Sequence, residues 1–290
     1  MAASSEPPSK KEENTYVLDA ESAAEMARLM RQDQLVTAGM GGIFPENIDL
    51  SGIQRVIDLA CGPGGWPLEV AYTYSDMDVI GVDISERMIK YASAQALVQQ
   101  RKNLQFRVMD ILKPLDFPDA SFDLVNARLI SGFMLRAKWP QLFQECLRIL
   151  RPGGILRLTE VEPGITNKFH HEKALQLGMQ AMSRAGVNFS PSGTRYGVVQ
   201  MLPAWYREAG LSILGARAHY IEYSFGTPAH DGFYHDLATA LQLFERVVVA
   251  TKIASAEEWH NLSQKALAEM HDEDFRAAWF LLTTWGSKAD

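Results

Sequence analysis

The stretch VIDLACGPGGWPLEVA, residues 56–71, joins an apolar run to a helical pattern through a glycine-rich turn. Its first part is apolar apart from Asp58 and is typical of a buried strand, and Pro67 is a favourable first residue for the helix that follows. Glycine lets the backbone approach a ligand closely where a strand of a parallel sheet turns into a helix. Because glycine-rich turns without a ligand are common, this stretch alone leaves both interpretations open.

Short apolar runs and amphipathic segments alternate on both sides of this stretch. The expected strands cover residues 56–60, 78–82, 104–108, 124–126 and 155–159. The expected helices between them cover residues 67–74, 87–99 and 139–150. Further elements are a helix from Asp19 to about Val36 and, near the C-terminus, strands over 212–224 and 277–285. The alternation predicts an α/β fold, with a parallel sheet and helices on both faces.

The length and composition are typical of an ordinary globular protein. The chain has 290 residues, 47% of them apolar, and a formal net charge of −7. This acidic balance disfavours a nucleic-acid partner, because phosphate contacts depend on Lys and Arg. No run approaches the ~18 apolar residues of a membrane-spanning helix, and the polar first 14 residues do not resemble a secretory signal. The two cysteines, Cys61 and Cys146, have no metal-ligand spacing, so we expect a cytoplasmic protein without a metal site.

Two further strands end near acidic residues. Asp83 ends the strand that follows the glycine turn, about 20 residues beyond Gly62, and Asp110 follows the next strand. A carboxylate at the first position accepts hydrogen bonds from both hydroxyls of a ribose, and one at the second suits the exocyclic amine of adenine. Helix capping by Asp83 and an exposed loop position for Asp110 are the structural alternatives. Because clustered carboxylates repel one another, their convergence at one sheet edge favours a nucleoside ligand.

Two residues bear on which nucleoside this is. The dinucleotide fingerprint GxGxxG needs a third glycine where Pro67 stands. Asp58 would face a pyrophosphate unfavourably, whereas it suits a ligand that carries an ammonium group and a sulfonium centre. The sequence therefore favours S-adenosylmethionine over NAD.

The motifs DLACGPG (58–64), VIGVDIS (79–85), VMD (108–110), FDLVNAR (122–128) and LRPGGILRLTE (150–160) together resemble the class I S-adenosylmethionine-dependent methyltransferases, in the branch that modifies small molecules. The resemblance is close over residues 53–159 and looser towards the C-terminus. One departure is Ala60, where many members have a glycine. The resemblance implies a Rossmann-like, doubly wound seven-stranded sheet of order 3-2-1-4-5-7-6 with the last strand antiparallel, and S-adenosylmethionine as the cofactor.

The resemblance also implies which residues contact the methionine part of the cofactor. Gly62 and Gly64, with Ala60 beside them, would line it, and Asp58 would approach its amino group. Asn126, at the end of the fourth strand, would lie near the transferred methyl group.

Five more residues are expected at the adenosine part. Asp83 would hold the ribose and Asp110 the adenine amine, while Ile84 and Ile111 would flank the ring. Met88 would cover the adenine, with plain core packing as the alternative.

The acceptor would bind to segments outside the sheet. Residues 15–45, 163–200 and 227–270 are rich in Met and aromatic residues, which suits helical lids over a small organic substrate, although such residues also serve as plain core. We expect residues 15–290 to form a single methyltransferase domain behind a disordered tail, residues 1–14.

Methyl transfer needs alignment, exclusion of water and sometimes a general base. The candidate bases are Glu160 and Glu162 after the fifth strand and His170 and His171 in the next segment, and we expect Glu160 and His170 to be catalytic. Arg128 would either bind an acidic group of the substrate or pair with a carboxylate of a lid.

A second functional hypothesis stays open. A protein with this fold can bind the cofactor and act as a cyclase, an isomerase or a binding module that transfers no methyl group. In both cases the expected partner is a small molecule, with no nucleic acid and no membrane, and a homodimer is left open.

Overall fold

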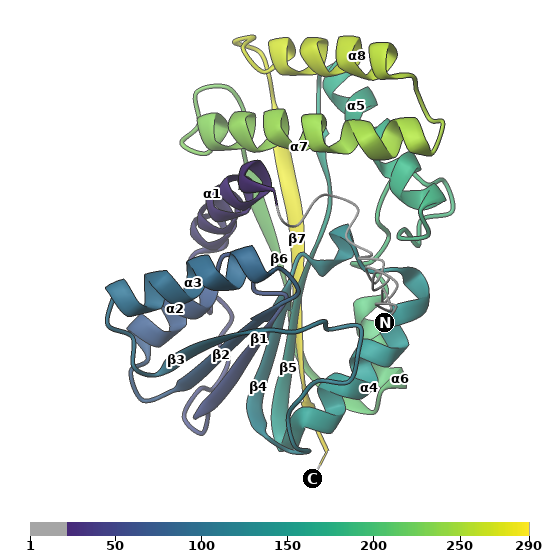
Figure 1. Cartoon of the computed structure of the whole chain (residues 1–290). Helices are drawn as coiled ribbons and strands as arrows, with labels where there is room; N and C mark the ends of the chain where they lie inside the picture. The colour runs from purple at the N-terminus through teal and green to yellow at the C-terminus, as the bar shows by residue number, and fades with distance from the viewer. Residues whose placement is uncertain (1–21, 290) are drawn as a thin grey trace, which may run out of the picture.

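The computed structural model describes residues 22–289, which build on one seven-stranded sheet (Figure 1). The strands are β1 (Arg55–Leu59), β2 (Asp78–Asp83), β3 (Leu104–Val108), β4 (Phe122–Arg128), β5 (Leu150–Thr166), β6 (Leu211–Glu222) and β7 (Ala277–Lys288). Their order is β3-β2-β1-β4-β5-β7-β6, and β7 runs antiparallel to both of its neighbours. The predicted α/β fold, strand order and antiparallel last strand are confirmed.

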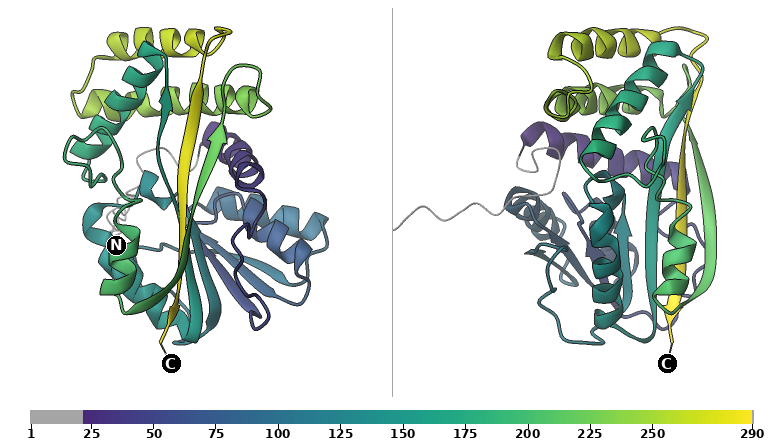
Figure 2. Two further views of the ribbon diagram at one scale, coloured as in Figure 1. Left: turned by 180° about the vertical axis from the view of Figure 1, so that it is seen from behind. Right: turned by 90° about the vertical axis from the view of Figure 1, so that its right-hand side faces the viewer.

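Helices cover both faces of this sheet and one of its ends. They are α1 (Ala23–Met40), α2 (Gly65–Thr73), α3 (Glu86–Val98), α4 (Trp139–Ile149), α5 (Phe169–Arg184), α6 (Leu202–Glu208), α7 (His230–Ala250) and α8 (Ala256–Glu269). Helices α2 and α3 lie against the β1–β3 half, α4 and α6 lie towards β5 and β6, and α5, α7 and α8 gather above the sheet (Figures 1 and 2). No helix between residues 22 and 289 is both long and apolar enough to cross a membrane.

The central strands are buried on both faces, which explains their unbroken apolar pattern. In β1, Val56 packs in the cluster that contains Trp66 of α2. The next residue, Ile57, packs on the opposite face in the cluster that contains Trp139 of α4. Alternate residues of a strand thus serve two cores, and the sheet lies between them.

Helix α1 begins at Ala23, with Ser22 as its N-cap, because the Ser22 hydroxyl accepts a hydrogen bond from the backbone N–H of Glu25. The predicted cap, Asp19, lies outside the described residues. The helix continues past the predicted end to Met40, and it stops where Gly41 takes a left-handed conformation with φ of 92°.

The last three strands are much longer than the first three. β5 has 17 residues and β6 and β7 have 12 each, whereas β1 has 5. The pairing of β4 with β5 ends at Arg128 and Thr159, but β5 continues to Thr166 and there pairs with β7 alone. This extension rises beyond the carboxyl edge of the other strands, and α1, α5, α7 and α8 pack around it (Figure 1).

Candidate functional site

A cavity of about 320 Å³ lies where the carboxyl ends of the central strands meet the helices above the sheet. One group of lining residues comes from the strand ends and the glycine turn, and another comes from α1, α5, α7 and the extension of β5 and β7. Eight predicted cofactor contacts line this cavity: Asp58, Ala60, Gly62, Asp83, Ile84, Met88, Asp110 and Ile111. The structure therefore brings together most of the residues that the sequence selected.

Asp83 holds the glycine turn against the end of β2. One carboxylate oxygen accepts a hydrogen bond from the backbone N–H of Gly62 at 2.9 Å, and the other accepts one from the N–H of Ser85 at 2.9 Å. The cap of α3 is Ser85 itself, whose hydroxyl accepts from the N–H of Met88 at 3.2 Å. The Asp83 carboxylate also lines the cavity, and this position at the end of β2 suits the hydroxyls of a ribose.

Asp110 is oriented in a similar way just after β3. Its Oδ1 accepts a hydrogen bond from the backbone N–H of Leu112 at 2.9 Å. Met109 and Ile111, on either side of it, also line the cavity, and Ile111 is buried. The site thus pairs a fixed hydrogen-bond acceptor with apolar side chains, which suits the edge and faces of a purine.

Asp58, at the end of β1, is almost completely buried. Its Oδ1 accepts a hydrogen bond of 2.6 Å from Nδ2 of Asn126. Burial raises the pKa of Asp58 to about 7, against the lowering effect of the Arg128 charge and of the Asn126 amide. A cation placed beside Asp58 in the cavity would therefore lower this pKa and favour the ionised carboxylate.

Asn126 is fully buried and is not among the residues that line the cavity, so its position does not match the expected contact with the methyl group. Its amide nitrogen holds Asp58, and its oxygen accepts a hydrogen bond of 2.7 Å from Nη1 of Arg157. Arg157 in turn forms two hydrogen bonds, of 3.0 and 3.1 Å, with the carboxylate of Glu46. A buried chain of hydrogen-bonded polar groups thus orients the Asp58 side chain from within the protein interior.

This polar chain continues to His219 of β6, whose Nε2 lies 3.5 Å from Oε1 of Glu46 and 3.1 Å from the hydroxyl of Thr283. Although burial by itself raises the pKa of Glu46, its hydrogen bond with His219 and its ion pair with Arg157 lower that pKa to about 2. The sequence analysis did not predict that Glu46, Arg157 and His219 interact. Glu46 and Arg157 are 111 residues apart, and no local pattern marks two charged residues as partners at that separation.

Gly64 also differs from its expected role, since it does not line the cavity. It is the N-cap of α2 and has a left-handed φ of 82°. A Cβ at this position would lie 2.6 Å from the ring of Phe106 and 2.8 Å from Cβ of Ala92. Glycine is needed here because of backbone conformation and packing.

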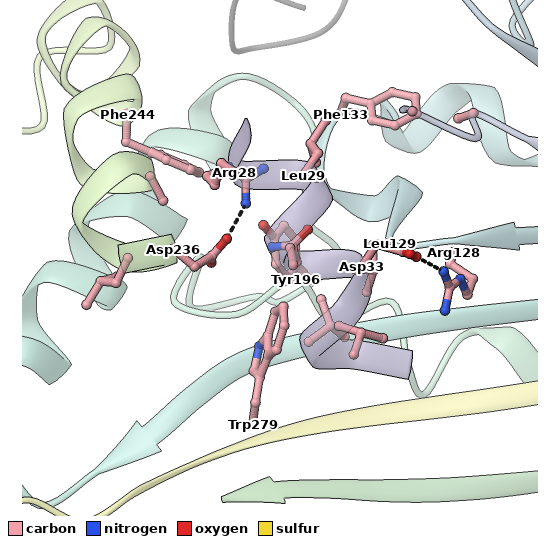
Figure 3. A pocket seen from close by; sticks show the side chains of 18 of the residues that line it. Arg28, Leu29, Asp33, Arg128, Leu129, Phe133, Tyr196, Asp236, Phe244 and Trp279 are labelled. Atoms are coloured by element: carbon pink, nitrogen blue, oxygen red, sulfur yellow. Dashed lines mark hydrogen bonds and ion pairs between the residues drawn. The ribbon is translucent and has the colours of Figure 1, made fainter. Parts of the chain in front are cut away.

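Arg128 pairs with a carboxylate of α1, which was one of the two predicted alternatives. It forms an ion pair with Asp33 (Figure 3). Its Nη1 donates a hydrogen bond of 3.0 Å to the hydroxyl of Thr37. A Cβ on Gly65 would overlap the Asp33 carboxylate, so the glycine turn permits the close approach of α1. Helix α1 is thereby fixed across the glycine turn.

Glu160 is placed where it orients the backbone. It is fully buried, and its two oxygens accept hydrogen bonds of 3.1 Å each from the N–H groups of Ile130 and Ser131. Burial raises its pKa to about 7, against the lowering effect of these hydrogen bonds. Glu160 does not line the cavity, so its position does not fit a base that reaches an acceptor. It instead fixes the turn that follows β4.

His170 also lies outside the cavity lining, and its Nδ1 is 2.6 Å from Oε1 of Glu269. The neighbouring His171 is buried and does line the cavity, with its Nε2 3.3 Å from the hydroxyl of Tyr223. Consecutive residues of a helix point about 100° apart, and only the folded position of α5 decides which histidine faces inwards. Burial lowers the pKa of His171 to about 4, so this side chain is neutral near pH 7.

Replacement of Glu160 by glutamine separates the structural role from a catalytic one. Glutamine keeps one acceptor oxygen but turns an NH₂ group towards a buried N–H, which costs about 1–3 kcal/mol. We expect urea unfolding to show this loss while affinity for S-adenosylhomocysteine stays within about threefold. Glu172→Gln, at an exposed position of α5, is the control and should change neither quantity. Loss of methyl transfer at unchanged stability would contradict the structural role.

Comparison with known proteins finds methyltransferases that are similar to part of this chain. Residues 56–154 match a family described as a methyltransferase domain. The chain is 32% identical over 117 residues to phosphoethanolamine N-methyltransferase 3 of Arabidopsis thaliana, a match that covers 40% of this chain and 23% of that protein. It is 34% identical over 116 residues to the demethylmenaquinone methyltransferase of Deinococcus radiodurans, covering 40% of this chain and 46% of that protein. The chain thus spans less than half the length of these curated relatives.

A solved structure extends the similarity to the whole fold. A candidate methyltransferase of Bacillus halodurans C-125 superposes with a TM-score of 0.55, over 92% of this chain and 100% of that one, at 15% sequence identity. At this level of identity the likeness concerns the fold alone.

Proposed function

We propose that this chain, whose residues 56–154 match a methyltransferase domain, transfers the methyl group of S-adenosylmethionine to a small organic acceptor. The observation that supports this most is the shared cavity. The same space that is lined by Asp58, Asp83 and Asp110 continues to apolar residues of α5 and α7. A cofactor and an acceptor can thus lie side by side without water between them.

The residues at the strand ends fit the proposed cofactor. Its ammonium group suits the buried carboxyl of Asp58, its ribose hydroxyls suit Asp83, and its adenine suits Asp110 with the flanking Ile111. Each carboxylate already accepts a hydrogen bond from within the protein, so each is oriented before a ligand arrives. When bound, the cofactor supplies a methyl group on a positively charged sulfur, which keeps the bonding electron pair when the acceptor takes the methyl.

The protein's own contribution is mainly position and shielding. Asp33 and Arg128 hold α1 over the glycine turn, and the apolar side chains of α5 and α7 close the other side of the cavity. Alignment of two reactants in a site without bulk water accounts for much of the acceleration of such displacements. We propose that α1, α5 and α7 act as the lids over the acceptor, and the acidic balance of the chain supports a small acceptor over a nucleic acid.

Calorimetric titration tests the cofactor directly. We expect both S-adenosylmethionine and S-adenosylhomocysteine to bind, and absence of binding by both would overturn the proposal. Mass spectrometry of reactions with a panel of phenols, quinols and amines then tests transfer. An acceptor heavier by one methylene unit supports transfer, whereas an isomerised compound with unchanged cofactor would support a cyclase or isomerase.

Asp58 makes binding of the cofactor dependent on pH. The ammonium group needs an ionised carboxylate, but the pKa of Asp58 is about 7 in the ligand-free protein because of burial. Below this pH binding must displace a proton, so affinity for S-adenosylhomocysteine is expected to fall by up to about tenfold per pH unit and to level off above it. Calorimetry in two buffers of different ionisation enthalpy measures the proton released. Asp58→Asn should remove this dependence, and a flat profile for the unaltered protein would contradict the role of Asp58.

A further inference from the structure

The part of the cavity beneath α7 is apolar and aromatic, and we call it the acceptor compartment. Its apolar lining includes Met179, Phe233, Leu237, Leu241, Phe244 and Trp279. Four of these residues repeat along α7 at helical spacing and form one stripe that faces the compartment. Flat aromatic walls of this kind favour a ring-bearing, apolar occupant.

One charged residue interrupts this stripe. Asp236 lies on the same face of α7 as Phe233 and Leu237 and lines the cavity (Figure 3). Its side chain is 13% exposed, and burial raises its pKa. A carboxylate in an apolar wall is costly unless hydrogen bonds compensate it, so its partners show what it is fitted to bind.

Asp236 shares one guanidinium with a second carboxylate. Arg28 of α1 donates from Nε and Nη2 to the two oxygens of Glu25, each at 2.7 Å, and from Nη1 to Oδ1 of Asp236 at 3.1 Å. The bidentate Arg28–Glu25 pair is balanced within α1. Arg28 thus places the Asp236 carboxylate at the wall of the acceptor compartment through one hydrogen bond and leaves its second oxygen, Oδ2, outside this pair. The hydrogen bonds from Arg28 and Gln32 leave acceptor capacity on the carboxylate, which can take about four.

The described residues that line the cavity offer no uncompensated cation to an anionic ligand. Among the described residues that line it, the arginines are Arg28 and Arg128, and no lysine is present. Arg28 is paired with Glu25 and Asp236, and Arg128 is paired with Asp33. His171 is neutral near pH 7, as its lowered pKa shows. Among these described residues, a phosphate or carboxylate on the acceptor would meet only arginines that are already paired with carboxylates.

We propose that Asp236 holds the proton-bearing atom of the methyl acceptor, and that the acceptor is a flat, apolar molecule with a hydroxyl or amine group and no anionic group. The inference rests on the proposed methyl transfer and adds its substrate class. Asp236 selects the acceptor by accepting a hydrogen bond from its O–H or N–H. The aromatic walls bind the rest of the molecule.

The test uses the full chain saturated with S-adenosylhomocysteine and four probes of similar size. 2-Naphthol and 2-naphthylamine carry a donor, 2-methoxynaphthalene has none, and 2-naphthoate is anionic. By calorimetry we expect at least one donor probe to bind about tenfold or more tightly than the methoxy compound, and 2-naphthoate to bind undetectably. The stronger donor probe distinguishes a hydroxyl from an amine acceptor.

Asp236→Asn should bring the donor probe and the methoxy compound to within about threefold of each other. The matched control is Asp231→Asn on the same helix, whose carboxylate is 87% exposed, and it should keep the full preference. The probe series in the unaltered protein decides the ligand class even where the variant does not fold.

Equal binding of 2-naphthoate and 2-naphthol, a preference unchanged in Asp236→Asn, or no binding of any probe would each overturn the inference. The titration with S-adenosylhomocysteine is a separate measurement. Its failure would overturn the proposed function, whereas success there with failure of the probes rejects the substrate class alone.

Discussion

Replacement of Asp83 by alanine is expected to weaken binding of S-adenosylhomocysteine by about 100-fold, or ~3 kcal/mol. Two losses combine in this result. The ribose hydroxyls lose a charged hydrogen-bond acceptor, and the N–H groups of Gly62 and Ser85 lose the carboxylate that holds the glycine turn at the end of β2. Calorimetric titration of the variant measures the change directly.

Asp78→Ala is the matched control for this experiment. Asp78 is the first residue of β2 and Asp83 is the last. Asp78 is exposed and lies at the amino end of the strand, away from the cavity. Affinity should therefore remain within about twofold. If Asp83→Ala also bound S-adenosylhomocysteine within about threefold of the unaltered protein, the carboxylate would serve the turn alone.

Replacement of Glu46 by alanine is expected to lower the free energy of unfolding by about 3–5 kcal/mol. The Arg157 and Glu46 side chains are both fully buried, so the variant leaves a guanidinium without its carboxylate in the interior. Urea unfolding measures the loss. Because Arg157 also orients Asn126 and, through it, Asp58, affinity for S-adenosylhomocysteine should fall as well.

Two comparisons isolate the buried charge as the cause. Glu86→Ala breaks the ion pair with Lys90, whose side chains are 68% and 72% exposed, and should cost less than about 0.5 kcal/mol. The double variant Glu46→Leu with Arg157→Met removes both buried charges and should recover much of the lost stability. A double variant no more stable than Glu46→Ala would contradict this explanation.

The glycine turn and the acidic strand ends could be predicted because their signals are local. An apolar run that ends in an acidic residue, as at Asp58 and Asp83, places a carboxylate at the carboxyl edge of a parallel sheet whatever the details of packing. Gly64 was correctly singled out but for a different reason. Its contact with Phe106 depends on how α2 and β3 lie against each other, which no turn motif encodes.

The acceptor side could be predicted only as a set of segments. Sequence reasoning placed residues 163–200 and 227–270 over the substrate and proposed His170, but it could not orient α5. The folded helix turns His171 towards the cavity, while His170 faces Glu269. Asp236 carries no local signal, because a single acidic residue in a long helix is ordinary.

The sequence by itself determined the class of fold, the strand order implied by its family resemblance and the row of carboxylates for a cationic cofactor. The fold class and the carboxylates follow from periodicity and from motifs within about 20 residues, whereas the strand order follows from the resemblance alone. Only the tertiary structure decided that Arg28 meets Asp236 and that Arg157 meets Glu46, pairs separated by 208 and 111 residues. Buried charges need partners, but the rule names no partner until the helices and strands are packed. The chemistry of the cofactor could therefore be inferred from local sequence, whereas the chemistry of the acceptor depended on the fold.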